Sequence, residues 1–151
     1  LDEPGVLDAT RCISYWTQTA EPMPDEVMDA LGGRVYGCDI CQDVCPWNRR
    51  RRLKGGEAFA PRPLALAPEL DDLAALDPAA FASRFRRSPV KRAKRRGLLR
   101  NVAVALGNAG SAEKRPALER LAGDEDPVVR EHAAWALVRL DARISRGAGS
   151  S

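Results

Sequence analysis

The chain has 151 residues, 44% apolar and 30% charged, which is enough for one domain or two small ones with a buried core. No run of about 18 apolar residues occurs, so we expect no membrane-spanning helix. Four cysteines are too few for a disulfide-dense scaffold. Because the first residue is Leu1 rather than Met, we expect a fragment or a processed chain.

The net charge of +3 conceals an uneven distribution of bases. Residues 49–54 and 84–100 together hold 14 of the 24 bases and none of the 21 acids, which leaves ten bases against 21 acids elsewhere. Concentrated bases form a directed positive surface, which is typical of nucleic-acid binding. Taken alone, they are equally consistent with solvated helix faces.

Helical patterns dominate, so the predicted fold class is mainly α. A short helix after Asp8 carries Cys12 and Trp16, and a second helix begins at Pro24 and ends at Gly32. Residues 55–68 are rich in Gly, Ala and Pro and predict an extended connector. Beyond it, pairs of an N-cap residue and proline predict three helix starts, at Asp77-Pro78, Ser88-Pro89 and Asp126-Pro127.

The second half of the chain contains a weak internal repeat. The helix from Pro89 is expected to end at Gly107, a short helix to cover about 113–122, and a last helix to cover 127–140. Residues 99–103 and 129–133 share an apolar–Arg–x–x–Ala pattern 30 residues apart, which predicts HEAT-type repeats. An ordinary antiparallel helical bundle is the alternative. The Gly/Ser tail is expected to be disordered.

The cysteines form the most specific motif, C-x2-C-x3-C-P, from Cys38 through Cys41 to Cys45. It matches the last three cysteines of a ferredoxin run, whose first cysteine would fall at Val35. Only Cys12 can substitute for it. Because the cysteine before the proline ligates the other cluster in two-cluster ferredoxins, Cys38 and Cys41 would share one iron–sulfur cluster with Cys12, and Cys45 would serve a second.

Three other uses of the cysteines remain open. A tetrahedral zinc site would use all four thiolates, although only one C-x2-C pair is complete. A disulfide framework and a set of buried structural thiols are less consistent with the spacing. Two four-iron clusters need about eight thiolates, so the remaining ligands would come from sequence outside this chain.

Together these motifs resemble one family, epoxyqueuosine reductase, over about residues 6–140. The blocks that carry the resemblance are R-C-I-S-Y at 11–15, V-Y-G-C-D-I-C-Q-D-V-C-P-W-N at 35–48, S-P-V-K-R at 88–92, L-L-R-N-V-A-V-A-L-G-N at 98–108 and V-R-E-H at 129–132.

The resemblance implies an oxidoreductase that converts epoxyqueuosine to queuosine at the wobble position of cytoplasmic tRNA. It further implies two [4Fe-4S] clusters, a cobalamin, and a proton donor upstream of Leu1 rather than in this chain. The expected division is a ferredoxin-like iron–sulfur segment at 1–54, a connector at 55–76, a HEAT-like repeat domain at 77–145 and a disordered tail at 146–151. The electron donor is left undefined.

Site residues follow from the same resemblance. The metal ligands would be Cys12, Cys38, Cys41 and Cys45. Ser14 and Asp39 would line the corrinoid, or instead bond within their own turns. The residues expected to contact tRNA phosphates are Arg49, Arg50, Arg51, Arg52, Lys91, Arg92, Lys94, Arg95 and Arg96. Arg100 and Arg130 are expected to form inter-helix salt bridges, and His132 to be a packing residue.

Two other functions remain as alternatives. The first is a four-cysteine metal-binding repeat module that binds RNA or protein without catalysis. The second is a relative of reductive dehalogenases, which the basic runs argue against because a small organohalide needs no phosphate-binding surface.

Overall fold

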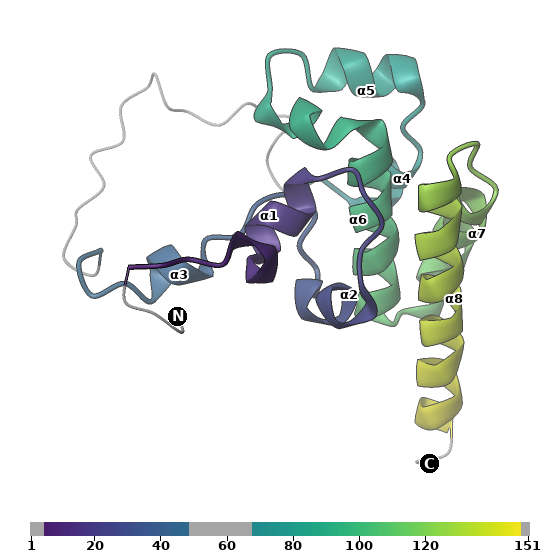
Figure 1. The fold of residues 1–151 in the computed structure, drawn as a ribbon. Coiled ribbons are helices and arrows are strands. Elements are labelled where there is room, and N and C mark those ends of the chain that lie inside the picture. The colour runs from purple at the N-terminus through teal and green to yellow at the C-terminus, as the bar shows by residue number, and fades with distance from the viewer. Residues whose placement is uncertain (1–4, 49–67, 149–151) are drawn as a thin grey trace.

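The computed structural model describes residues 5–48 and 68–148, and every regular element in these ranges is helical. The mainly α prediction is therefore confirmed. The α-helices, shown in Figure 1, are α1 (Ile13–Gln18), α2 (Asp25–Leu31), α3 (Ile40–Asp43), α4 (Leu70–Ala74), α5 (Pro78–Arg84), α6 (Lys94–Ala109), α7 (Arg115–Ala122) and α8 (Pro127–Ala148). Three short 3-10 turns join them, at Ala9–Arg11, Pro89–Ala93 and Ala112–Lys114. Within these ranges no helix combines the length and apolarity needed to cross a bilayer.

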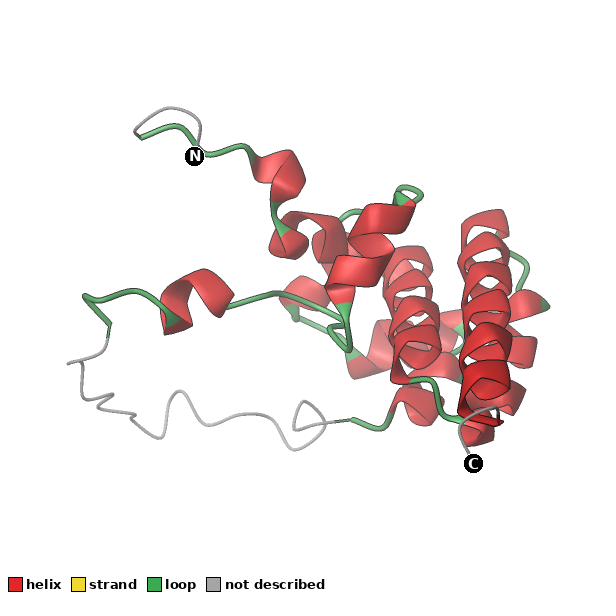
Figure 2. Ribbon diagram, turned by 90° about the horizontal axis from the view of Figure 1, so that it is seen from below, coloured by secondary structure: helices red, strands yellow, loops and turns green. Residues whose placement is uncertain are grey.

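Helix α6 forms the centre of the molecule, with α8 lying alongside it (Figures 1 and 2). A glycine permits this close approach, because a Cβ on Gly107 would lie 2.7 Å from the Cβ of Ala136 on α8. Helices α4 and α7 complete the main core, whose fully buried large side chains are Leu98, Leu99, Leu106, Leu118, Leu121 and Leu140. Gly107 was expected to end the helix and instead lies inside it.

We expect the Gly107→Ala substitution to lower the free energy of unfolding by about 1–3 kcal/mol, because the added methyl group overpacks the α6–α8 contact. The better helix propensity of alanine offsets only part of this loss. Gly123→Ala is the matched control, since the atom nearest to its added Cβ would be 3.6 Å away. Thermal unfolding should show a lower midpoint for Gly107→Ala alone; equal midpoints would contradict this packing.

Helices α1 and α2 pack on α6 and form a second, smaller core. Its buried members are Met23, Met28, Leu31 and Val104. The loop after α1 lies almost against the α6 backbone, because a Cβ on Gly97 would be 2.5 Å from the carbonyl oxygen of Thr19. The cysteine-bearing N-terminal segment is therefore attached directly to the central helix of the repeat region.

The predicted helix starts are confirmed at Asp77 and Asp126. The Asp77 carboxylate accepts from the Ala80 N–H (2.7 Å), and the Asp126 carboxylate accepts from the Val128 N–H (3.0 Å). Ser88 also caps, but it begins the 3-10 turn Pro89–Ala93 rather than α6. The turn meets α6 at Lys94, the first residue of that helix, whose φ of 57° is unfavourable for a residue with a Cβ.

Helix ends differ more from the predictions than helix starts do. Asp8 caps the 3-10 turn Ala9–Arg11, whereas Cys12 is the N-cap residue of α1. Helix α6 ends before Gly110, which has a left-handed conformation with φ 71°. Helix α8 continues to Ala148, beyond the predicted end of the repeat domain at 145 and into the expected tail. The apolar periodicity stops earlier than the helix because its last turns are exposed.

The far end of the expected connector belongs to the helical core. Residues 70–74 form α4, and Leu73, Ala74 and Leu76 are buried in the main core. Most of the connector, with the predicted tRNA contacts at 49–52, lies outside the described residues.

Candidate metal centre and nucleic-acid interface

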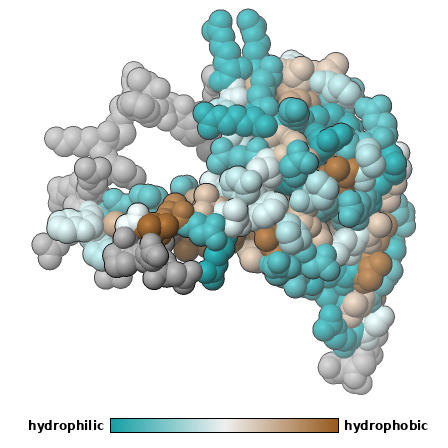
Figure 3. All heavy atoms as spheres, viewed as in Figure 1, coloured by the Kyte–Doolittle hydropathy of each residue, from teal (hydrophilic) through white to brown (hydrophobic). Residues whose placement is uncertain are grey.

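The four cysteines lie on two separate arms of the N-terminal segment. Cys12 immediately precedes α1, whereas Cys38, Cys41 and Cys45 lie in and around α3. All four are free thiols; Cys41 is exposed and the others are half-buried. Helix α3 lies apart from the helix bundle in Figures 1 and 2. In the space-filling view its end of the molecule shows apolar side chains, consistent with the exposure of Ile40 and Val44 (Figure 3).

The donor chemistry of the arms fits a thiolate-bound metal or cluster. Free, accessible thiols are the ligands that iron–sulfur clusters and structural zinc require. In the described parts of the chain, however, no three His, Cys, Asp or Glu side chains stand close enough together to hold a metal ion.

Arg100 of α6 holds the Cys12 arm in place. Arg100 is fully buried and donates to the carbonyl oxygens of Trp16 (2.6 Å), Thr19 (3.2 Å) and Glu21. These groups lie at the C-terminal end of α1, where helix carbonyls lack partners of their own. Burial lowers the pKa of Arg100 to about 10, although the negative charge of Glu21 acts in the opposite direction and raises it. The guanidinium therefore stays protonated at neutral pH. The prediction that Arg100 forms an inter-helix salt bridge is wrong, because its partners are carbonyl groups.

His132 connects α8 to the same segment. Its Nε2 accepts from the Met23 N–H (3.0 Å), and its Nδ1 lies 2.8 Å from the carbonyl oxygen of Val128. This pair of partners fits a neutral ring with the proton on Nδ1. Burial, together with the nearby charge of Arg100, lowers the pKa of His132 below 6.5. The side chain is a satisfied packing residue, as the sequence predicted.

We expect the His132 ring to make folding stability dependent on pH. Its pKa is lower in the folded than in the unfolded chain, so the unfolded state binds a proton more readily below about pH 6.5. The stabilisation is complete above that pH and is lost progressively as the pH falls below it, through the lowered pKa of the folded state. Denaturation at pH 7.5, 6.5 and 5.5 should show a decline that the His132→Gln variant reduces. An identical decline in the variant would contradict this expectation.

The two residues expected to line a corrinoid make local contacts. The Ser14 hydroxyl accepts from Gln18 Nε2 (3.0 Å) one turn later. Asp39 is exposed at the start of α3, where its backbone carbonyl accepts from the N–H groups of Gln42 and Asp43. Ser14 has the local partner that the alternative expected, whereas the Asp39 side chain makes no capping hydrogen bond. The cofactor role of both residues stays a prediction.

The structure divides the predicted phosphate-binding residues of the second basic run into two groups. Lys91, Arg92 and Lys94 are exposed beside the start of α6. Arg95 instead pairs with Asp124 (2.7 Å) and Arg96 pairs with Asp126 (2.6 Å). Both acids lie in the loop between α7 and α8. In Figure 3 hydrophilic side chains project from the top of the molecule, over α5 and the turn before α6.

The ion pair with Arg95 also affects the pKa of Asp124. Burial raises the pKa of Asp124, but the hydrogen bonds from Arg95 and the Asp126 N–H outweigh it and keep the net pKa below its ordinary value. Arg95 Nε additionally donates to the Leu76 carbonyl (2.8 Å). Arg95 therefore joins the end of α4, α6 and the loop before α8. Sequence reasoning missed this role, because nothing local in the basic run distinguishes Arg95 from Lys94.

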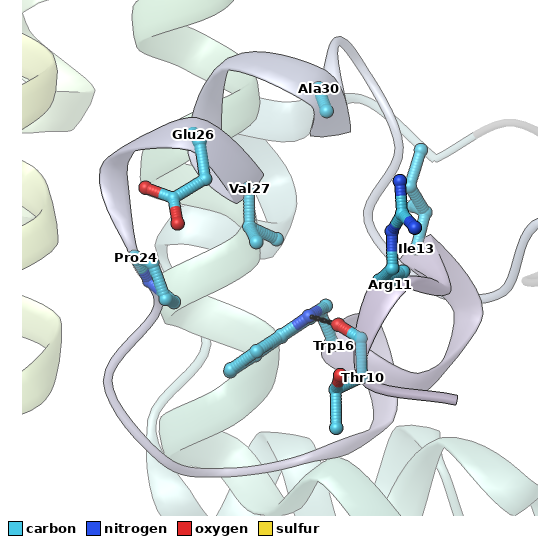
Figure 4. Close-up of a pocket in the computed structure, with 8 residues that line it drawn as sticks. All are labelled: Thr10, Arg11, Ile13, Trp16, Pro24, Glu26, Val27 and Ala30. Atoms are coloured by element: carbon cyan, nitrogen blue, oxygen red, sulfur yellow. Dashed lines mark hydrogen bonds between the residues drawn. The ribbon is translucent and has the colours of Figure 1, made fainter. Parts of the chain in front are cut away.

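A pocket of about 580 Å³ lies between α1 and α2 (Figure 4). Trp16 and Val27 form its apolar walls, and Arg11 and Glu26 supply charge. The Trp16 indole donates to the Thr10 carbonyl (2.6 Å), which fixes the ring against the 3-10 turn. Trp16 is half-buried, consistent with a packing role, whereas Trp47, the other tryptophan beside the cysteines, is 87% exposed.

Two domain families match the chain. Residues 1–48 match the 4Fe-4S double cluster binding domain, and residues 91–146 match HEAT repeats. These matches agree with the predicted order of an iron–sulfur segment followed by helical repeats. The exact boundaries at residues 54, 76 and 145 stay predictions.

Whole-chain comparisons lead to the same family. The chain is 45% identical to epoxyqueuosine reductase of Escherichia coli K12 over 91% of its own length and 36% of that protein. It is also 45% identical to epoxyqueuosine reductase of Pseudomonas aeruginosa over 90% of its length, covering 38% of that relative. The chain thus spans well under half of these relatives.

Solved structures agree. A selenomethionine-labelled epoxyqueuosine reductase matches with a TM-score of 0.83 and 36% identity, over 91% of this chain and 37% of the other. An epoxyqueuosine reductase with an epoxyqueuosine-modified tRNA-Tyr stem loop matches with a TM-score of 0.83 and 32% identity, over 98% of this chain and 41% of the other. Over nine-tenths of its length, the chain is therefore similar in sequence and in fold to one part of epoxyqueuosine reductases. This is the family that its sequence motifs resemble.

Proposed function

We propose that the protein containing this chain is an epoxyqueuosine reductase that acts on tRNA, with this chain contributing cluster ligands and part of the tRNA-docking surface. The observation that carries the proposal is the similarity in sequence and fold over nine-tenths of the chain. Removing the epoxide oxygen as water takes two electrons and two protons. We propose a cytoplasmic location, because tRNA and reduced thiols occur together there.

The cysteine assignments form part of this proposal. Cys12, Cys38 and Cys41 would ligate one [4Fe-4S] cluster, and Cys45 a second. When bound, the clusters would supply single electrons and a cobalamin would act at the epoxide. Ser14 and Asp39 lie beside the ligands, where they are able to contact such a cofactor. The proton donor is not assigned to this chain.

The exposed bases have a separate role in the proposal. Lys91, Arg92 and Lys94 would neutralise tRNA phosphates and so position the anticodon arm without reading its sequence. Arg95 and Arg96 are already paired with acids, so we assign them to holding the repeat together. Arg49–Arg52 remain proposed contacts that follow the cysteine cluster directly in sequence.

The proposed activity is tested by incubating the intact, anaerobically prepared protein and an electron donor with tRNA that contains epoxyqueuosine. Nucleoside analysis should show queuosine replacing epoxyqueuosine. Tight tRNA binding with the epoxide unchanged would instead support a binding module without catalysis.

We expect the double variant Lys91→Ala/Arg92→Ala to reduce the dependence of tRNA binding on salt. Its slope of log affinity against log salt should become shallower by about 2, because two phosphate contacts are lost. The double variant Arg120→Ala/Arg146→Ala removes the same charge from exposed positions on α7 and α8. Filter binding at several salt concentrations should change the slope only for the first variant; equal slopes would refute a local contact.

A further inference from the structure

The two cysteine arms are joined to each other by a buried network around Asn101 of α6. Its side-chain amide donates to the Thr17 carbonyl (2.9 Å) at the end of α1 and to the Val35 carbonyl (2.8 Å) on the other arm. Thr17 is itself fully buried, and its hydroxyl accepts from the Gly37 N–H (2.9 Å). The arms are therefore connected twice, within a few residues of Cys12 and Cys38.

Each of the three residues before Cys38 is held by a different partner. The Val35 carbonyl accepts from Asn101, the Tyr36 hydroxyl donates to the Pro89 carbonyl (2.6 Å), and the Gly37 N–H donates to Thr17. Beyond Cys38 the chain leaves the bundle as α3 (Figure 1). The last anchored point of this arm is thus immediately next to its first cysteine.

The orientation of the Asn101 amide is itself fixed. Its oxygen accepts from Arg100 Nε (3.1 Å) and Nη2 (2.9 Å), so its nitrogen must face the two carbonyls. The side chain is fully buried, and all of its polar atoms have partners. It therefore acts as a rigid spacer between α1 and the segment before α3.

We propose that Asn101 is a positioning residue for the metal site, setting the separation of the Cys12 and Cys38 arms and thereby the geometry and reduction potential of the cluster they share. The inference rests on the proposed function, which assigns both cysteines to one cluster. Groups behind the ligands are known to tune cluster potential and metal retention.

The chain offers a closely matched control in Asn108. It lies two turns further along α6 and likewise donates to two carbonyls, of Met28 (2.8 Å) and Gly32 (3.2 Å). Those carbonyls end α2, which carries no cysteine. Removing either amide costs two hydrogen bonds to carbonyls. Asn101→Ala also removes an acceptor of Arg100, but only the Asn101 amide lies between cysteine arms.

The test compares Asn101→Ala with Asn108→Ala in the intact protein after anaerobic loading with iron and sulfide. Asn101→Ala should shift the midpoint potential and EPR spectrum of one cluster and speed iron release to a chelator by about tenfold. Asn108→Ala should match the wild type in all three. If Asn101→Ala does not fold, Asn101→Asp decides, because it keeps the side-chain shape and the acceptor for Arg100 but removes the N–H donors to the Thr17 and Val35 carbonyls.

The possible results separate this inference from the proposed function. Wild-type potential, spectrum and iron release in Asn101→Ala, or in Asn101→Asp where that variant decides, would overturn the inference. Equal changes in Asn108→Ala would also overturn it, because the effect would then be general destabilisation. A wild-type protein that assembles no iron–sulfur cluster would overturn the proposed function and the inference with it.

Discussion

Replacing Arg100 with methionine is expected to lower the free energy of unfolding by about 3 kcal/mol. The fully buried guanidinium donates to three carbonyls in and just after the last turn of α1, and methionine fills similar space without donors. The substitution also relieves the cost of burying a charge, which the lowered pKa of Arg100 reflects. We expect the unpaired carbonyls and the freed Asn101 oxygen to outweigh that relief, because they lie where water cannot replace the lost donors.

Arg130→Met is the matched control for this substitution. Arg130 occupies the corresponding position of the second repeat and also donates to two carbonyls, of Asp124 (2.9 Å) and Glu125 (2.8 Å). Its side chain is exposed, so water can satisfy those carbonyls and the loss should be within about 1 kcal/mol. Urea denaturation measures both values. Equal losses for the two variants would contradict the assignment of Arg100 as the main anchor of the cysteine segment.

Single cysteine substitutions in the intact protein are expected to remove one cluster each and abolish reduction. Cys12→Ala and Cys45→Ala should each retain about four of about eight iron atoms, because the two residues would ligate different four-iron clusters. The reaction should then stop in both variants, since electrons could no longer pass through both clusters. Iron and acid-labile sulfide analysis, with the conversion assay, measures these losses.

Double substitutions make the cluster assignment testable. Cys12→Ala/Cys38→Ala should lose no more iron than Cys12→Ala, because both residues would serve one cluster. Cys12→Ala/Cys45→Ala should lose nearly all of the iron. If every single variant lost all bound metal, one site with four cysteine ligands would be indicated instead, as the zinc alternative requires.

Local sequence signals predicted much of this molecule. The caps at Asp77 and Asp126 act within three residues of the chain, so their hydrogen bonds follow from the sequence around them. The cysteine spacing likewise predicted an iron–sulfur segment, which agrees with the domain family that residues 1–48 match. Helix ends were less predictable, because Gly107 serves a close contact with α8 rather than a helix terminus.

Long-range partners could not be predicted from the basic run. Its arginines look alike in sequence, yet Arg92 is exposed, Arg95 is paired with an acid 29 residues later, and Arg100 is buried against α1. The partners of Arg100 are backbone carbonyls, which no side-chain pattern reveals. The 30-residue repeat was the one available signal, since it aligns Arg100 with Arg130, another residue that donates to carbonyls.

The central claim is that this chain supplies thiolate ligands to the iron–sulfur clusters of a tRNA-modifying reductase. Its most direct test is to measure iron, acid-labile sulfide and zinc in the intact protein, purified without oxygen. The account predicts iron and sulfide in equal amounts, at about eight of each per protein, with a brown colour. Stoichiometric zinc without sulfide or colour would contradict it.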